Sequence, residues 1–299
     1  DTRNAHFVQA LEHFWNSWAN MRSDILLIVC GSAASWMIKK LISNKGGLHN
    51  RVTKRLQIEP FNLAETEAFL KNLGANYSKY QIVQLYMVFG GIPYYLEQIN
   101  VSQSDVQNIN TLCFKSNAFF KTEYDLLFGS LFNHHHRHQD VMAALAKKGS
   151  GMTRSEILKY SKLDSGGTTS SILRELEESS FIRKYSAYGK KEKDHVYQLI
   201  DFYSLFYLKH ISKVANSDST YWIDNFNSPK YFAWAGYSFE LVCLTHISVI
   251  KKALGIQGIG SETLSWRSAE AQIDLIIDRK DSVINLCEIK FSLGKYKLT

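Results

Sequence analysis

Four charged side chains in the last quarter of the chain have types and spacing suited to metal-assisted hydrolysis. Asp274 lies within the apolar stretch IDLII, and Glu288 and Lys290 lie two residues apart in VINLCEIKF. Glu240 lies on the helix that the sequence predicts just before them. Charges among buried apolar residues are costly unless they are paired or hold a metal. This group is therefore the first candidate for a chemical site.

The expected chemistry follows from the alternation of side chains along a strand. Glu288 and Lys290 should share a strand face with Ile284 and Leu286, which we expect to be buried. Two carboxylates brought together at strand ends, Asp274 and Glu288, can hold Mg²⁺ through oxygen ligands. A nearby lysine can then orient or deprotonate a water while the metal stabilises a phosphoryl oxygen. The residues alone leave open a plain ion pair between Glu288 and Lys290, with Asp274 solvated.

The stretch from Glu240 to Lys290 resembles the PD-(D/E)XK nuclease superfamily, with a helix glutamate, then Asp274, then Glu288-x-Lys290 on the next strand. The resemblance implies a restriction-endonuclease-like α/β domain over residues 230–299. It implies that Asp274 and Glu288 bind the metal, that Lys290 assists the attacking water, and that Glu240 supports the metal or the water.

Residues 1–60 predict two strands of an α/β sheet. The segment DILLIVCGS, beginning at residue 24, is a continuous apolar run of the kind found in parallel strands buried on both faces. A helix is expected over residues 33–43, and RVTKRLQIEP over residues 51–60 alternates like a second strand. From residue 61 to about residue 132 the pattern becomes helical, which predicts a small helical domain.

Residues 139–200 predict three helices followed by two strands, the layout of a winged helix-turn-helix. In the second helix, Thr153 and Glu156 have the spacing of a capping box. The third helix offers only Arg174 and three glutamates, so sequence-specific DNA binding is not expected, and intramolecular docking is the alternative. Basic residues of the predicted wing could contact phosphates without sequence specificity; they are Arg183, Lys184, Lys190, Lys191 and Lys193. The preceding histidine run at 134–138 is expected to be a solvated linker.

Three segments, LLIVCGSAASWM, GGLHNRVTKRLQIEPF and GGIPYYLEQI, closely resemble the archaeal-type AAA+ ATPases of the STAND group. The resemblance implies part of a P-loop core over 1–60, a helical lid over 61–132, a winged helix over 139–215 and the nuclease-like domain. It implies that Ser32 lies near the γ-phosphate of ATP and that Arg51 senses phosphate or a neighbouring subunit. The residues alone allow a helix N-cap and a surface charge.

No G-x-x-x-x-G-K-[ST] phosphate loop occurs in the sequence. We therefore expect a fragment that begins after the Walker B strand and is cut at both ends, and that would not hydrolyse ATP alone.

The composition is that of a globular protein, with 299 residues, 45% hydrophobic and 21% charged. No segment reaches the roughly 18 apolar residues of a membrane helix, so we expect no membrane partner. A net charge of +7 favours acidic partners such as nucleic acid once the charge is clustered. Four scattered cysteines without zinc or redox spacing indicate a reduced, cytoplasmic compartment.

Taken together, these patterns predict an α/β multidomain protein with a partial P-loop AAA+ core, a helical lid, a winged helix and a restriction-endonuclease-like domain. The expected function is that of an ATP-binding STAND-type regulatory ATPase whose nuclease-like domain cleaves nucleic acid with Mg²⁺. ATP, DNA bound without sequence specificity and further copies of the chain are the expected partners. The alternative is a non-catalytic adaptor that binds nucleic acid or protein and keeps a relic nuclease fold.

Overall fold

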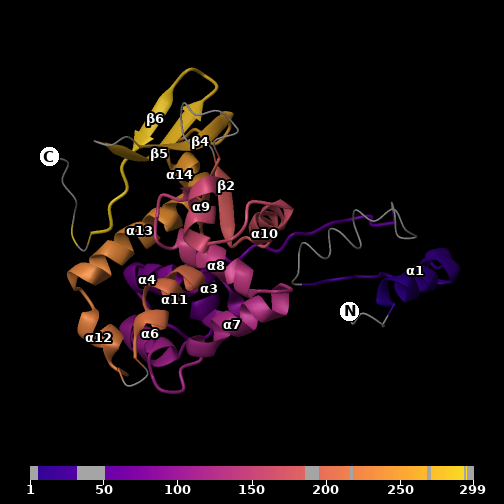
Figure 1. Cartoon of the computed structure of the whole chain (residues 1–299), viewed down its shortest axis with the longest axis horizontal. Helices are drawn as coiled ribbons and strands as arrows, with labels where there is room; N and C mark the ends of the chain where they lie inside the picture. The colour runs from indigo at the N-terminus through magenta and orange to yellow at the C-terminus, as the bar shows by residue number, and fades with distance from the viewer. Residues whose placement is uncertain are drawn as a thin grey trace.

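The computed structural model describes residues 6–31, 51–185, 195–215, 218–267, 271–292 and 294. These residues form a mixed α/β structure, mostly helical, with two three-stranded antiparallel sheets. Figure 1 shows a helical body that carries the sheet of β4, β5 and β6 at one end, while the N-terminal helix α1 stands apart at the end of extended chain.

The described residues before position 60 form helix α1 (Phe7–Ser17) and the 3₁₀ turn η1 (Ala19–Met21). Residues 25–31 and 51–60, expected as strands of a buried sheet, form no strand. Their apolar side chains are exposed, Leu26 by 84%, Ile28 by 76% and Ile58 by 93%. The expectation was wrong for these segments because a strand needs neighbours for its N–H and C=O groups, and the described residues supply none. The helix expected over 33–43 lies outside the described residues.

The helical pattern expected after residue 61 is confirmed. The helices are α3 (Leu63–Asn72), α4 (Lys79–Phe89), α5 (Pro93–Leu96), α6 (Asp105–Cys113) and α7 (Phe120–Leu131). Helices α3, α4 and α6 each begin with a capping box, made by Asn62 with Glu65, Ser78 with Gln81, and Ser104 with Gln107. The side chain and backbone of each pair satisfy each other's first-turn groups, so the local sequence fixes where these helices start.

Three helices and two strands follow where the sequence predicts them. They are α8 (His136–Leu145), α9 (Arg154–Ser161), α10 (Gly167–Glu178), β2 (Ile182–Tyr185) and β3 (Val196–Leu199). A short strand, β1 (Met152–Thr153), completes an antiparallel sheet of order β1-β3-β2. The expectation of a solvated linker at the histidine run was wrong at its end, because α8 begins at His136 and His138 is buried.

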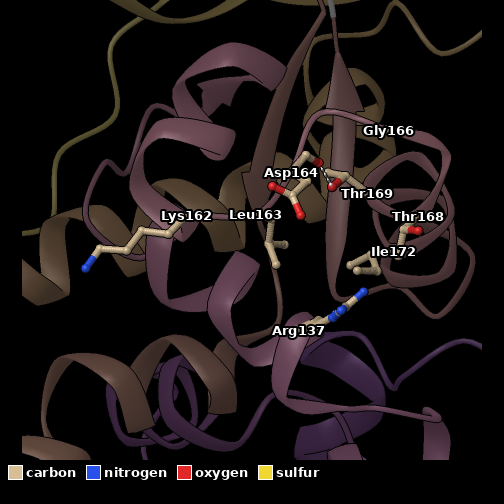
Figure 2. Close-up of a pocket in the computed structure, with 8 residues that line it drawn as sticks. All are labelled: Arg137, Lys162, Leu163, Asp164, Gly166, Thr168, Thr169 and Ile172. Carbon is tan, nitrogen blue, oxygen red and sulfur yellow. Dashed lines mark hydrogen bonds between the residues drawn. The ribbon is translucent and has the colours of Figure 1, made fainter.

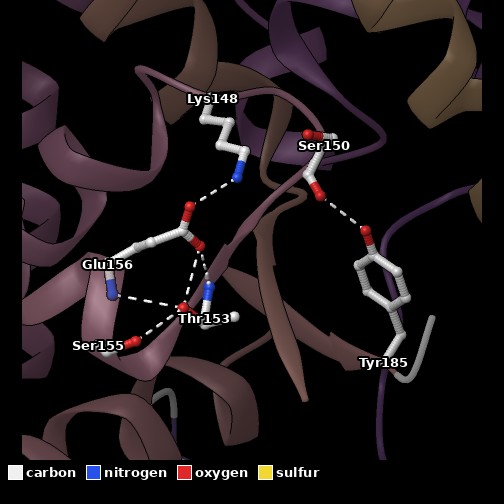
Figure 3. Close-up of polar contacts among 6 residues, drawn as sticks. All are labelled: Lys148, Ser150, Thr153, Ser155, Glu156 and Tyr185. Atoms are coloured by element: carbon white, nitrogen blue, oxygen red, sulfur yellow. Dashed lines mark hydrogen bonds and ion pairs between the residues drawn. The ribbon is translucent and has the colours of Figure 1, made fainter. Parts of the chain in front are cut away.

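The predicted capping box at the start of α9 is confirmed, and Figure 3 shows its surroundings. The Glu156 carboxylate accepts from the Thr153 backbone N–H at 2.8 Å and from the Lys148 ammonium at 2.7 Å. The Tyr185 hydroxyl donates to the Ser150 carbonyl oxygen at 2.7 Å. These bonds fix the end of β2 and the start of α9 to the loop between α8 and β1.

The remaining elements are α11 (Phe202–Lys209), the 3₁₀ turn η4 (Ile211–Lys213), α12 (Tyr221–Asn225), α13 (Pro229–Thr245), α14 (Ile247–Ala253), β4 (Ser261–Arg267), β5 (Gln272–Arg279) and β6 (Ile284–Cys287). The last three strands form an antiparallel sheet of order β4-β5-β6. No single helix in the described chain is long and apolar enough to cross a membrane. Helices α13 and α14 meet that criterion only when taken together, across the 73° bend between them.

One hydrophobic core extends from Leu70 to Val242. It includes helices α3 to α7, which we call the helical unit, the unit of α8 to α10 with the β1-β3-β2 sheet, and helices α11 to α13. Phe206 of α11 is fully buried, and its ring centroid lies 5.0 Å from that of Trp222 and 5.2 Å from that of Trp234. A second, small cluster forms where Leu275 and Ile277 of β5 pack near α14. The predicted helical domain and the predicted winged helix thus share one hydrophobic core with helices α11 to α13.

The other face of the β4-β5-β6 sheet is open. Ile284 is 45% exposed and Leu286 is 64% exposed, so the expectation that these two residues are buried was wrong. The alternate residues Cys287 and Ile289 are the ones that pack in the cluster beside α14. The alternation of the strand was predicted, but the buried face was assigned to the wrong set of residues.

Within the main core, His210 is 3% exposed, and its Nδ1 lies 3.2 Å from the Tyr221 hydroxyl oxygen. Burial, together with the charges of Lys230, Lys213 and Lys209, lowers the pKa of His210 to about 3. Because this folded-state pKa lies below the unfolded value of about 6.5, the unfolded chain takes up the proton first as the pH falls.

The contribution of His210 to the free energy of unfolding should therefore be complete above about pH 6.5 and decrease as the pH falls toward 3. We expect His210 alone to account for a loss of about 2 kcal/mol between pH 6.5 and pH 5. Urea unfolding at the two pH values measures this loss in the wild type and in His210→Gln. An equal loss in both proteins would assign the pH dependence to other groups.

Candidate functional site

Asp274 is the only one of the four candidate hydrolytic residues that is buried, at 5% exposure. Its Oδ1 accepts from the Gln272 side-chain amide at 2.6 Å, and its Oδ2 accepts from the Ile289 backbone N–H at 2.9 Å. The carboxylate thus ties the chain that follows β6 to strand β5. The alternative of a solvated Asp274 is wrong.

Glu288 and Lys290 lie beyond β6, which ends at Cys287, so the expectation that they stand on the strand was wrong. They form an ion pair with each other, with side chains 48% and 46% exposed. The register pairs Leu275 with Cys287, which sets Glu288 opposite Asp274 along the backbone. Yet the Glu288 side chain is exposed while that of Asp274 is buried, so this register does not make a two-carboxylate site.

Glu240 lies on α13, and its charge and that of Asp274 both act on the Cys243 thiol. Burial, together with the charges of Glu240 and Asp274, raises the pKa of the Cys243 thiol to about 11. No three His, Cys, Asp or Glu side chains in the described residues are grouped so that they could hold a metal ion. With both Asp274 oxygens accepting protein N–H groups, these residues do not fit a Mg²⁺ site in this arrangement.

The observed role of Asp274 can be tested by substitution. Asp274→Ala leaves the Ile289 N–H without its acceptor, and we expect the free energy of unfolding to fall by about 1–3 kcal/mol. Glu288→Ala, which removes an exposed charge, should change it by no more than about 0.5 kcal/mol. Chemical denaturation compares the two variants, and equal effects would show that the Asp274 bonds carry no stability.

Of the two residues assigned to ATP sensing, only Arg51 lies in the described part of the chain. Arg51 is exposed at the start of the extended segment that leads to α3, and the described chain places no ion-pair partner beside it. Ser32 lies outside the described residues.

The chain enters the helical unit through a tightly held junction at residues 61–63, which sequence analysis did not identify. The Phe61 N–H donates to the Gly91 carbonyl oxygen at 2.8 Å, and the Tyr86 hydroxyl donates to the Phe61 carbonyl oxygen at 3.0 Å. The Leu63 N–H donates to Nε2 of His246 at 2.9 Å. We call these three contacts the entry clamp.

The glycine pair in GGIPYYL was the available signal for the clamp. Gly90 has a φ of +63°, and a Cβ at Gly91 would lie 1.8 Å from the Phe61 carbonyl oxygen. Only glycine lets the two backbones approach so closely. His246 gave no local signal, because it lies 183 positions from Leu63 in the sequence.

The basic residues of the predicted wing differ in their surroundings. The Arg183 Nε donates to the Gln198 side-chain oxygen at 2.7 Å, and its guanidinium carbon lies 4.9 Å from the centre of the Tyr185 ring. Burial lowers the pKa of Arg183. Arg183 thus packs on the sheet, whereas Lys184 is exposed. The other three basic residues, Lys190, Lys191 and Lys193, lie outside the described residues.

A hollow of about 230 Å³ lies at the turn between α9 and α10. It is lined by Arg137, Lys162, Leu163, Asp164, Gly166, Thr168, Thr169 and Ile172. Figure 2 shows the Arg137 side chain below Ile172, whereas Lys162 points away from the other residues. Helix α10 begins at this hollow without a side-chain cap, so its first N–H groups can meet an anion.

Helix α10 is fixed to α8 by a buried polar contact. Nε2 of His138 lies 3.0 Å from one Glu175 carboxylate oxygen, and the Ser171 hydroxyl donates to the other at 3.1 Å. Glu175 is therefore used within the fold, and Arg174 remains exposed on the same helix. The orientation of α10 against the rest of the unit is thus set by named side chains.

Comparison with known proteins gives one distant similarity. An uncharacterized protein of Methanocaldococcus jannaschii, MJECL04, is 25% identical over 270 residues, which cover 89% of this chain and 59% of that protein. The chain thus spans about three fifths of the length of this relative, whose name states no activity. No protein-family model matches the sequence, and no solved structure matches it.

Proposed function

We propose that the chain is the lid, winged-helix and C-terminal part of a STAND-type regulatory ATPase of the AAA+ class. The observation that carries the proposal is a pair of extended segments, the apolar run at residues 25–31 and the mixed segment at residues 51–58, whose apolar side chains are largely exposed. Exposed apolar surface of this kind marks a place where another part of a protein packs. The parallel sheet of a P-loop core would bury both segments, and ATP would bind between that core and the helical unit.

The helical and winged-helix units after residue 61 are arranged so that they could relay a nucleotide-dependent change. Helices α8 to α10 with a sheet of order β1-β3-β2 have the element order of a winged helix. This unit shares one core with the helical unit, and the entry clamp holds residues 61–63, which directly follow residues 51–60, against the helical unit. A displacement of residues 51–60 would therefore move the helical and winged-helix units together.

The test uses the full-length protein and a fluorescent ATP analogue, with hydrogen exchange as a second measurement. We expect binding of the analogue, and slow amide exchange in residues 25–31 and 51–58. Arg51→Ala should weaken the response to ATP, while Lys115→Ala, which removes an exposed lysine just after α6, serves as the control. Fast exchange in both segments together with no ATP binding would refute the proposal.

A second candidate function is nucleic-acid binding through the winged-helix unit. The hollow at the start of α10 combines uncapped N–H groups with Arg137, and Lys184 is exposed on β2. Such groups contact phosphates and give affinity without sequence specificity. This is the adaptor alternative, and it is compatible with the ATPase proposal.

Salt-dependent binding to duplex DNA tests this candidate. Arg137→Ala and Lys184→Ala should each lower the slope of log affinity against log salt concentration by about one, and the combined Lys190, Lys191 and Lys193 alanine variant by more. Lys230→Ala on α13 should leave the slope unchanged. Equal slopes in all these proteins would remove the winged-helix unit from DNA binding.

We propose that the C-terminal unit is non-catalytic in the arrangement seen here, because Asp274 is held by protein N–H groups and Glu288 is paired with Lys290. A nuclease assay on single- and double-stranded DNA and RNA, with Mg²⁺ or Mn²⁺, tests this. We expect no cleavage, and the same heat of Mn²⁺ titration for the wild type and Asp274→Ala. Cleavage that disappears in Lys290→Ala would contradict the proposal and establish a nuclease site.

A further inference from the structure

His246 stands at the bend between α13 and α14, and both of its ring nitrogens meet backbone groups. Nδ1 lies 2.7 Å from the Val242 carbonyl oxygen, and Nε2 lies 2.9 Å from the Leu63 backbone nitrogen. A carbonyl oxygen can only accept, so Nδ1 carries the hydrogen; a backbone N–H can only donate, so Nε2 offers its lone pair. The two bonds therefore require the neutral imidazole in a single tautomer.

The imidazole completes the N-terminal cap of α3 from a distant part of the chain. Asn62 accepts from the N–H groups of Ala64 and Glu65, and His246 takes the N–H of Leu63, the first helical residue. The ring also lies edge-on to Tyr86, with centroids 5.5 Å apart, and the Tyr86 hydroxyl holds Phe61. His246 thus contacts two of the groups that form the entry clamp.

The same residue sits where the C-terminal unit leaves the main core. Helix α13 contributes Leu241 and Val242 to that core, whereas Ile247 and Ile250 of α14 pack in the separate cluster beneath β5. The 73° bend between the helices lies at His246. A change in the position of this side chain therefore acts at the point that orients α14 and the β4-β5-β6 sheet.

We propose that His246 is a latch that fastens the C-terminal sheet unit to the entry of the helical unit. Movement of residues 61–63 is passed through the imidazole to α14 and its sheet. The inference deepens the proposed ATPase function, which supplies the source of the movement, but the latch itself exists without nucleotide.

The latch can be broken from either side. His246→Phe keeps a ring and removes the acceptor, whereas Leu63→Pro removes the donor at the first helical position, where proline is well tolerated. Leu63→Ala keeps the N–H and controls for the lost side chain. Thr245→Ser controls for a change next to His246, since it keeps the hydroxyl that lies 3.1 Å from Nδ1 of His246 and bonds to the carbonyls of Leu241 and Val242.

The measurement is residue-resolved amide exchange of the full chain without nucleotide. We expect His246→Phe to raise exchange at Leu63 by up to about tenfold, as for the loss of one hydrogen bond, and to raise it also across residues 247–253. Leu63→Pro should raise exchange across residues 247–253, and both control variants should match the wild type there. His246→Gln, which keeps an acceptor and a donor, should restore part of the protection.

Two outcomes would overturn the latch. One is unchanged exchange at Leu63 in folded His246→Phe. The other is faster exchange at Leu63 with residues 247–253 unchanged in His246→Phe and Leu63→Pro, which would make His246 only a helix cap. Should His246→Phe not fold, Leu63→Pro against Leu63→Ala decides the question alone.

A separate arm with ATP in the full-length protein tests the source of the movement. Failure to bind ATP would refute the proposed function, while the nucleotide-free exchange data would still decide the latch.

Discussion

Replacing Gly91 with alanine is expected to lower the free energy of unfolding by about 3 kcal/mol or more. A Cβ at this position would lie 1.8 Å from the carbonyl oxygen of Phe61 and 2.7 Å from its backbone nitrogen. Both are backbone atoms, so no side-chain rotation can relieve the overlap. The new methyl group must push apart the two segments that the Phe61–Gly91 hydrogen bond holds together.

Urea unfolding measures the effect, and Gly236→Ala is its matched control. Gly236 lies inside α13 with open space where a Cβ would go, so alanine there should raise the free energy of unfolding by about 0.5–1 kcal/mol. A Gly91→Ala protein as stable as the wild type would mean that the entry clamp does not exist in solution.

Phe206→Ala should cost about 3–5 kcal/mol, the range for emptying a phenylalanine site in a packed interior. The ring is fully buried among Phe114, Trp222 and Trp234, which come from α6 and its flanks, α12 and α13. Because these elements share one core, the variant should unfold in one transition shifted to lower denaturant, with the same midpoint for helical and tryptophan signals.

The control for that experiment is Phe206→Leu, which keeps most of the buried volume and should cost clearly less than the alanine variant. Circular dichroism and tryptophan fluorescence would follow the unfolding. If the two signals separate in Phe206→Ala, with the tryptophan transition alone displaced, the helical unit and α13 do not form a single cooperative core.

Features decided by neighbouring residues could be predicted from the sequence. The side chains of Thr153 and Glu156 each accept from the other residue's backbone N–H, so residues within one turn determine where α9 begins. The apolar residues of β5 likewise predicted a strand, which the structure has at Gln272–Arg279. In these places the partner of each backbone group lies within a few positions or directly across a hairpin.

Features decided by distant partners could not be predicted. The apolar run at 25–31 predicted a buried strand, but apolar composition says nothing of which chain supplies the neighbouring strands. The packing of Arg183 against Gln198 and Tyr185 depends on the register of β2 and β3, and the bond from Leu63 to His246 joins residues 183 positions apart. Asp274 and Glu288 come opposite each other in register, but the Asp274 carboxylate is buried and bonded to N–H groups of the protein, whereas Glu288 is exposed and paired with Lys290.

The exposed apolar run at residues 25–30 is expected to promote aggregation of newly synthesised protein. The segment ILLIVC holds branched side chains without a charge or a proline, a composition that forms intermolecular β-structure readily. Exposed as it is, the segment offers its backbone to any other copy that meets it at high concentration. The yield of dispersed protein in a cell should therefore depend on how soon this segment is covered, more than on the stability of the helical body.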